Sequence, residues 1–406
     1  MIYIFTLAIL IILVIRFDYK YVGKNRICFD SHALTQYDLW YRVVLIWFIC
    51  VSGFAYNVGS DIPTYMREYQ SFGSIWKINT LADLFEFDNR KPGWVLINVI
   101  CASICKNFVL IKLVIAIFVN WSVFRFFKRH TKYVFTGILF YAVILYLALN
   151  FNALRQAVAV GFFMIGTDFL LTKQWKKYYL FAFFSFMFHS SGIICFLIPL
   201  FSLIKFNKKV LVLFAVILVV GTIYSLKSDV LQNLAASFIL SEYGGDNISE
   251  LGSIYMENAD DRVGALNFLG VLKVVFNVCI VLLVMLFNAR KDNESSTMIS
   301  MIAGYTIFYV ISFAIPLIFE RFLYFFYPFY ICGIAKAIME FSVKAKGIRP
   351  VLTIVMVVFF SYIPLTNLFA ENVSSGIPLI NQFAPYYSVF NPKIDPVRAA
   401  HFGYWE

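Results

Sequence analysis

The chain has 406 residues, of which 61% are hydrophobic and only 14% are charged. Soluble domains carry about 25% charged residues and lack apolar runs of about 20 residues, so this composition excludes an ordinary soluble protein. The apolar runs recur along the whole chain without alternating, which excludes a barrel of strands and favours helices. The sequence therefore predicts an all-α, polytopic integral membrane helical bundle.

The formal net charge of +11 comes from Lys and Arg residues gathered in short clusters between the apolar runs. Such clusters are typical of the cytoplasmic loops of membrane proteins, so we interpret them as orientation signals and expect no nucleic-acid partner. The seven cysteines lie almost all within apolar runs and show no metal-binding spacing. They predict neither a metal site nor a disulfide framework.

The first part of the chain predicts two helices that lead to an outward-facing loop. The helices cover residues 1–15 and 39–56, and the basic residues between them place the N-terminus outside. A polar loop at 57–91 follows on the outer side. The run at 92–105 is short for a span and the next basic cluster follows the run at 108–127, so we expect 92–105 to be a half-helix or an interfacial helix.

The middle of the chain predicts a helical hairpin and a helix that folds back on itself. Residues 133–150 and 154–171 form the hairpin, with its tip outside. Lysines flank both ends of the run at 178–204, so both ends should be inside and the run must turn back near 188–192. His189 is thereby placed at a break in a helix at membrane depth, where non-helical backbone lines a cavity or is packed within protein.

The last part of the chain predicts five more helices, an acidic outer loop and an outer tail. The helices are expected at 210–226, 266–287, 296–319, 322–340 and 350–369, the loop at 227–262 and the tail at 370–406. We expect one transmembrane domain over residues 1–406, with about ten to twelve spanning or half helices. No soluble enzyme domain or internal repeat is visible, so any chemistry is expected at the membrane, at its outer face.

Two arginines near the expected outer face are candidate anion-binding residues. Ionisable groups at membrane depth are costly and are therefore candidate functional groups. The forked guanidinium of Arg155 suits a phosphate or pyrophosphate, while snorkelling or a structural ion pair explains it equally well. Arg321 follows Glu320 between two predicted helices, where an exposed loop pair is the alternative.

Three further residues are candidates for proton transfer and sugar binding. His189 is either a general base or a hydrogen-bonded core residue. Asp61 follows Gly59 and either caps the next helix or offers a carboxylate to a sugar hydroxyl. Tyr65 and Tyr69 share a helix face and either stack on sugar rings or anchor the helix at the interface. No DxD pair, Gly-rich phosphate loop, Ser/His/Asp set or HExxH is present, so a mechanism without metal or cofactor is the simpler hypothesis.

Short motifs follow one another on successive predicted helices: Val58-Gly59-Ser60-Asp61 with Tyr65, Pro92-Gly93, Arg155-Gln156-Ala157-Val158-Ala159 and Phe188-His189-Ser190-Ser191. Together with Arg321 and Tyr324 farther along, their order resembles the EpsG-like branch of the Wzy oligosaccharide repeat-unit polymerases. The resemblance is good from residue 51 to residue 200 and weaker afterwards. Lys91 departs from it, because the family more often has an acidic residue before the proline.

This resemblance implies a GT-C-like membrane glycosyltransferase in the inner membrane of a bacterium, with its active site facing the periplasm. Its donor and acceptor would be undecaprenyl-pyrophosphate-linked oligosaccharides, which it would join into O-antigen, capsule or exopolysaccharide. A separate chain-length regulator protein would be a further partner.

The resemblance also implies roles for individual residues. Arg155 and Arg321 would stabilise the leaving pyrophosphate. His189 or Asp61 would accept the hydroxyl proton, and we favour His189 because it is expected to lie deeper. The remaining substrate-binding candidates are Tyr65, Gln156 and Tyr324.

Two other functions remain open at this point. An O-antigen ligase uses the same donor on the same side of the membrane but transfers it to lipid A core, and the sequence does not separate it from a polymerase. A flippase or transporter of lipid-linked oligosaccharides predicts broken helices in matching positions of two repeated halves, and no such repeat is visible.

Overall fold

A computed structural model describes residues 1–20, 31–73, 90–201, 293–314, 316–344, 349–371 and 376–402, with residue 203 and single positions within 210–216 and 275–286. Within these residues every regular element is a helix, and the only extended pairings are two isolated bridges. The prediction of an all-α membrane protein is confirmed. The expected outer loop at 227–262, residues 74–89 of the first outer loop and most of the helices expected at 210–226 and 266–287 lie outside the described residues.

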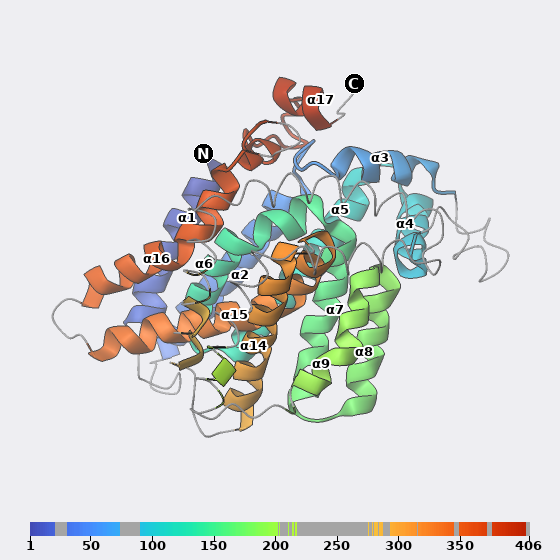
Figure 1. Cartoon of the computed structure of the whole chain (residues 1–406). Coiled ribbons are helices and arrows are strands. Elements are labelled where there is room, and N and C mark those ends of the chain that lie inside the picture. The colour runs from blue at the N-terminus through green and yellow to red at the C-terminus, as the bar shows by residue number, and fades with distance from the viewer. Residues whose placement is uncertain are drawn as a thin grey trace. The chain divides into compact units, whose positions relative to one another are not determined.

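The helices are labelled as in Figure 1. In chain order they are α1 (Ile2–Leu13), η1 (Val14–Tyr19), α2 (Ser31–Gly53), α3 (Ile62–Ser71), α4 (Pro92–Ile104), α5 (Phe108–His130), α6 (Val134–Ile144), η5 (Ala148–Asn152), α7 (Leu154–Leu171), α8 (Trp175–Phe188), η6 (Ser190–Ile193), α9 (Ile194–Phe201), α14 (Asn293–Ala314), α15 (Pro316–Lys344), α16 (Arg349–Phe369), η7 (Leu379–Gln382) and α17 (Pro396–Phe402). Of the short elements, η1 and η5 are π-helices, and η6 and η7 are 3₁₀-helices.

The described helices form two compact units. The first comprises Met1–Leu197, Ile334–Ala370 and Pro378–Glu406, and the second comprises Ile198–Gly333 and Glu371–Ile377. The single transmembrane domain and the outward orientation of its loops stay predictions.

Several of these helices are long and apolar enough to cross a membrane, so the chain is a multi-pass membrane protein. Among the described residues the candidate spans are Ile2–Tyr19, Leu34–Gly53, Phe108–His130, Leu154–Leu171 and Phe319–Glu340. α4 has 13 residues and is shorter than a span, as expected for a half-helix. α3 has 10 residues, and Pro63 occupies its first turn, where the missing N–H of proline costs nothing.

In the first unit, α7 packs against both α5 and α8 (Figure 1). Small residues on α7 allow this close approach, as is common between membrane helices. A Cβ atom on Gly161 would lie 2.7 Å from the Phe118 ring of α5, and one on Gly166 would lie 2.9 Å from Cβ of Phe181 on α8. The two faces of α7 are therefore complementary in shape to α5 and α8. This packing holds α7, and with it the first residues of the helix, in place.

The run that was expected to fold back does so at His189. α8 ends at Phe188, and after η6 the chain returns as α9. The Tyr178 hydroxyl near the start of α8 donates a hydrogen bond to the Cys195 carbonyl (2.5 Å), and the rings of Tyr179 and Phe196 stack with centroids 6.1 Å apart. This prediction is confirmed, and it explains how two short helices replace one long one.

The helix expected over 133–150 is broken, which corrects the sequence interpretation. α6 ends at Ile144, and the chain reaches α7 through η5. The side chain of Asn150 bonds Asn120 of α5 (2.8 Å), the Tyr141 hydroxyl (2.7 Å) and the Tyr146 carbonyl (3.1 Å). Polar groups without water need such partners, so this buried network holds the backbone in the wider π-turn.

In the second unit the expected boundary between two helices is also corrected. The helices were predicted at 296–319 and 322–340, with Arg321 between them, but α14 ends at Ala314 and α15 begins at Pro316. Proline disfavours helix in the residue before it and suits the first position of a new helix, so Pro316 sets the boundary rather than the charged pair. Stacked rings of Tyr305 and Tyr330, with centroids 4.4 Å apart, join the two helices.

Candidate functional site

Arg155 lies at the start of α7, and no side chain caps this helix end. Its guanidinium carbon is 5.9 Å from the centroid of the Tyr65 ring. The Nε atom is buried without a hydrogen-bond partner, and no carboxylate of the described residues forms an ion pair with Arg155. The next residue, Gln156, is buried. An uncapped helix N-terminus and an arginine without a counter-ion both favour a negatively charged ligand at this point.

The turn at Gly59 holds α3 against the start of α7. Gly59 has φ +111°, and a Cβ atom there would overlap the Phe151 carbonyl, so only glycine fits. The Ser60 N–H donates to Oδ1 of Asn152 (2.8 Å). Since Asn152 ends η5 directly before α7, this turn brings Asp61 and Tyr65 to the Arg155 end of the unit.

Asp61 is exposed at the N-cap position of α3, but its side chain makes no capping hydrogen bond. The Ser60 hydroxyl donates to Oδ1 of Asp61 (3.3 Å). The ordinary capping interpretation therefore does not account for this carboxylate.

Tyr65 is buried between the other candidate residues. Burial raises the pKa of the Tyr65 phenol, and the nearby Arg155 opposes this rise only partly, so the phenol stays neutral at physiological pH. Its ring packs against Trp94 of α4 with centroids 5.4 Å apart. Tyr69, on the same buried face of α3, donates its hydroxyl to the Cys105 carbonyl (2.6 Å).

His189 joins α8 to η6 and is buried. Its Nδ1 accepts the Ser191 N–H (3.1 Å) and lies 2.6 Å from the Ser191 hydroxyl. Because Nδ1 is an acceptor in this geometry, the neutral ring carries its proton on Nε2. Phe188, which precedes His189, contacts α4. A Cβ on Gly93 of α4 would lie 2.9 Å from the Phe188 ring, so α4 packs tightly against this break.

The remaining two candidates belong to the second unit. Arg321 and Tyr324 lie within the first turns of α15 rather than in a loop. Arg321 is half-buried, while Glu320 before it is more exposed. The Tyr324 ring packs against Tyr327 with centroids 6.2 Å apart.

The C-terminal segment packs against the Gly59 turn, a contact that no sequence pattern indicated. The Gln382 carbonyl accepts the Gly59 N–H (2.9 Å), and the Gln382 side chain accepts from Nδ2 of Asn152 (2.7 Å). Arg398 is 0% exposed, and its Nη1 donates to the Asn57 carbonyl (2.8 Å). Residues far apart in the chain thus jointly support one turn.

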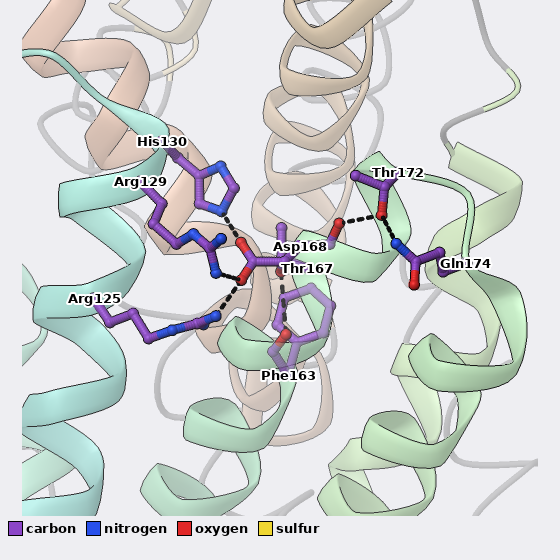
Figure 2. A network of polar contacts seen from close by, with 8 residues as sticks. All are labelled: Arg125, Arg129, His130, Phe163, Thr167, Asp168, Thr172 and Gln174. Carbon is purple, nitrogen blue, oxygen red and sulfur yellow. Dashed lines mark hydrogen bonds and ion pairs between the residues drawn. The ribbon is translucent and has the colours of Figure 1, made fainter.

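The opposite end of α7 carries an ionic cluster around Asp168 (Figure 2). Arg125 and Arg129, one turn apart on α5, both pair with Oδ2 of Asp168, and Nε2 of His130 lies 3.0 Å from Oδ1. Arg125 and Arg129 belong to the basic cluster that the sequence predicted at the cytoplasmic side. Their spacing of four residues was visible in the sequence, but nothing there identified Asp168 as the shared partner.

Within the described part of the chain, no three His, Cys, Asp or Glu side chains gather closely enough to hold a metal ion. The model of one protein family, described as the EpsG family, matches residues 38–388, which cover most of the chain and every residue that the sequence predicted for the site. No curated protein and no solved structure matches the chain.

Proposed function

This chain belongs to the EpsG family, and we propose that it is the polymerase that joins lipid-linked repeat units of a polysaccharide. Family membership makes it a membrane protein of polysaccharide biosynthesis. In the proposed reaction the donor is a growing glycan on undecaprenyl pyrophosphate, and the acceptor is a single lipid-linked repeat unit. The site faces the periplasm at the inner membrane of a bacterium.

The observation that carries this proposal is the state of Arg155. It adds a positive charge to the helix end that is already positive, and no carboxylate of the described residues forms an ion pair with it. A pyrophosphate supplies the missing negative charge and accepts the forked donors of the guanidinium. The arrangement stabilises a leaving group whose charge grows in the transition state.

The chemistry then needs a group that takes the proton of the attacking hydroxyl. The hydroxyl oxygen bonds to the anomeric carbon of the donor, its proton passes to the base, and the bond between that carbon and the pyrophosphate oxygen breaks. Asp61 fills this role better than His189, because its carboxylate is exposed and makes no cap. The Nδ1 of His189 already accepts a backbone hydrogen, so His189 acts as a donor through Nε2.

Arg321, Tyr324 and Gln156 keep the roles expected for them from the sequence. Arg321 would bind pyrophosphate oxygen, and Tyr324 and Gln156 would contact the substrate. The position of these residues on α15 and α7 does not identify what they bind. Each role is therefore tested by a variant of that residue in the assay below.

The proposal is tested with purified protein and a synthetic undecaprenyl-pyrophosphate-linked repeat unit in the presence of EDTA, with the products resolved by size. We expect a ladder spaced by one repeat unit. Arg155→Lys keeps the charge but loses the fork, so turnover should fall about 100-fold. Arg67→Lys is the matched control, because Arg67 is exposed on α3.

Three results would contradict the proposal. Absence of a ladder with the cognate substrate, while lipid-linked sugar crosses proteoliposomes, would indicate a transporter. Transfer to lipid A core without a ladder would indicate a ligase. Unchanged turnover in Arg155→Lys would remove Arg155 from the pyrophosphate role.

A further inference from the structure

Four buried polar atoms around Tyr65 have no hydrogen-bond partner within the described residues. They are Oε2 of Glu68, Nε of Arg90, Nε1 of Trp94 and Nε of Arg155, and each exposes less than 1 Å² to solvent. Trp94 is 1% exposed and Glu68 is 9% exposed. Buried polar atoms in proteins are nearly always paired, so a group of unpaired ones marks a place that a ligand completes.

Tyr65 connects these side chains. Tyr65 and Glu68 lie one turn apart on the buried face of α3. The Tyr65 ring contacts Trp94 on one side and faces the guanidinium of Arg155 on another. Oε1 of Glu68 pairs with Arg90, which leaves Oε2 as the unpaired acceptor. Beside the Tyr65 ring, therefore, the unit offers the Glu68 acceptor and the donors of Trp94 and Arg155, and Arg90 joins this group through its pair with Glu68.

We infer that these side chains bind a sugar ring of the lipid-linked substrate. Oε2 of Glu68 accepts a hydrogen bond from one sugar hydroxyl, and Nε1 of Trp94 donates one to a sugar oxygen. This inference rests on the proposed polymerase function and names a subsite for which Glu68, Arg90 and Trp94 carried no expectation from the sequence. Arg155 lies where this subsite meets the pyrophosphate.

The mixture of donor and acceptor identifies the ligand class. A sugar hydroxyl donates one hydrogen bond and accepts others, so a single ring satisfies both kinds of atom. A phosphate has acceptors only, and the Glu68 carboxylate would repel it. Two packed aromatic rings beside the polar atoms also suit a sugar, which presents an apolar C–H face between its hydroxyls. The competing explanation is an ordered water that bonds these atoms.

Trp94→Phe is the variant that separates these explanations. It keeps a ring beside Tyr65 and removes the N–H that has no partner in the protein. In the polymerase assay we expect KM for the lipid-linked repeat unit to rise about tenfold with kcat changed less than twofold. The thermal unfolding midpoint should fall modestly, because the smaller ring leaves a cavity at this buried position, so KM is measured on folded protein. Glu68→Gln should raise KM in the same way, because an amide placed at Oε2 converts the acceptor into a donor.

Inhibition by undecaprenyl pyrophosphate without sugar shows which part of the substrate is bound. Trp94→Phe should leave this inhibition unchanged, whereas Arg155→Lys should weaken it. Trp47→Phe is the matched control, because Nε1 of Trp47 is paired with Thr6 (2.9 Å). Its KM should equal that of the wild type while its unfolding midpoint falls.

Each remaining outcome has one meaning. An unchanged KM in Trp94→Phe and Glu68→Gln, with the wild type forming a ladder, would overturn the sugar subsite in favour of an ordered water. If Trp94→Phe weakened the binding of the substrate and of undecaprenyl pyrophosphate equally, the assignment to sugar would be overturned. A wild-type protein that forms no ladder contradicts the polymerase proposal itself, which is a different failure.

Discussion

The two ends of α7 carry charges of opposite sign, and the protein treats them in opposite ways. Asp168 near the C-terminal end and Arg155 at the N-terminal end each add to the helix dipole instead of opposing it. Arg125, Arg129 and His130 all contact Asp168, and the buried Nδ1 of His130 has no hydrogen-bond partner in the described part of the chain (Figure 2). Arg155 has no such counter-ion among the described residues.

We propose that this difference separates a structural anchor from a binding site. A buried charge that is paired within the protein holds two helices together and needs no ligand to neutralise it. A charge left without a counter-ion is unfavourable in the empty protein and becomes favourable when a ligand of opposite sign arrives. Under the proposed function, one end of α7 stabilises the fold and the other end binds the substrate.

The largest expected effect is on activity at the Arg155 end. Arg155→Ala removes the donors to the leaving pyrophosphate, so kcat should fall about 10³-fold, equivalent to about 4 kcal/mol of transition-state stabilisation. Its free energy of unfolding should decrease by only about 1 kcal/mol, because the guanidinium loses its contact with the Tyr65 ring while Nε has no partner to lose among the described residues. Thermal unfolding in detergent alongside the ladder assay measures both. A clear loss of stability would break the comparison by making Arg155 structural.

Asp168→Asn should give the converse result. It leaves Arg125 and Arg129 without their carboxylate and should lower the free energy of unfolding by about 3 kcal/mol, toward the lower end for a broken buried pair because Arg129 is 53% exposed. Folded variant protein should keep the wild-type KM. Lys128→Gln is the control, since its pair with Asp38 is exposed on both sides and should matter little.

Arg398→Lys sharpens the comparison at the Arg155 end. The lysine reaches one of the Asn57 and Pro385 carbonyls that Arg398 bonds, so the lost hydrogen bond should cost about 2 kcal/mol of unfolding free energy. The Gly59 turn also loses support, so kcat should fall several-fold. The inhibition constant of undecaprenyl pyrophosphate should change little. Equal kcat in variant and wild type would show that the C-terminal segment stabilises the fold without positioning Asp61.

Gln382→Ala should have the smallest effect. It removes the side-chain bond to Asn152 (2.7 Å) but keeps the backbone bond to Gly59, so the loss of stability should be about 1 kcal/mol. Activity should fall less than in Arg398→Lys. A larger loss than in Arg398→Lys would reverse the order of the two contacts in supporting the turn.

Much of the architecture was predictable because its signals are local. Apolar runs, basic clusters and the break at His189 are each read from about 20 neighbouring residues. The errors arose where one residue outweighed the pattern. Pro316, rather than the Glu320–Arg321 pair, separates α14 from α15, and the Asn150 network breaks the helix expected to end there.

The candidate site was predictable only in part. Arg155, Asp61 and His189 stood out because charged and titratable residues are rare in apolar surroundings. The hydrogen-bonding state of His189 did not, since it depends on a turn that presents the Ser191 N–H to Nδ1. Glu68 and Trp94 did not stand out either, because each is ordinary in sequence and unusual only in lacking a partner when buried.

The sequence by itself determined that this protein is a helical membrane protein and that Arg155 lies at the start of a spanning helix. Patterns of hydrophobicity and charge are local, so they can be recognised in the sequence without knowledge of the fold. The tertiary structure alone decided which of the described charges form ion pairs within the protein and which do not. That choice depends on contacts between distant residues, such as Asn152 with Gln382, which lie 230 positions apart.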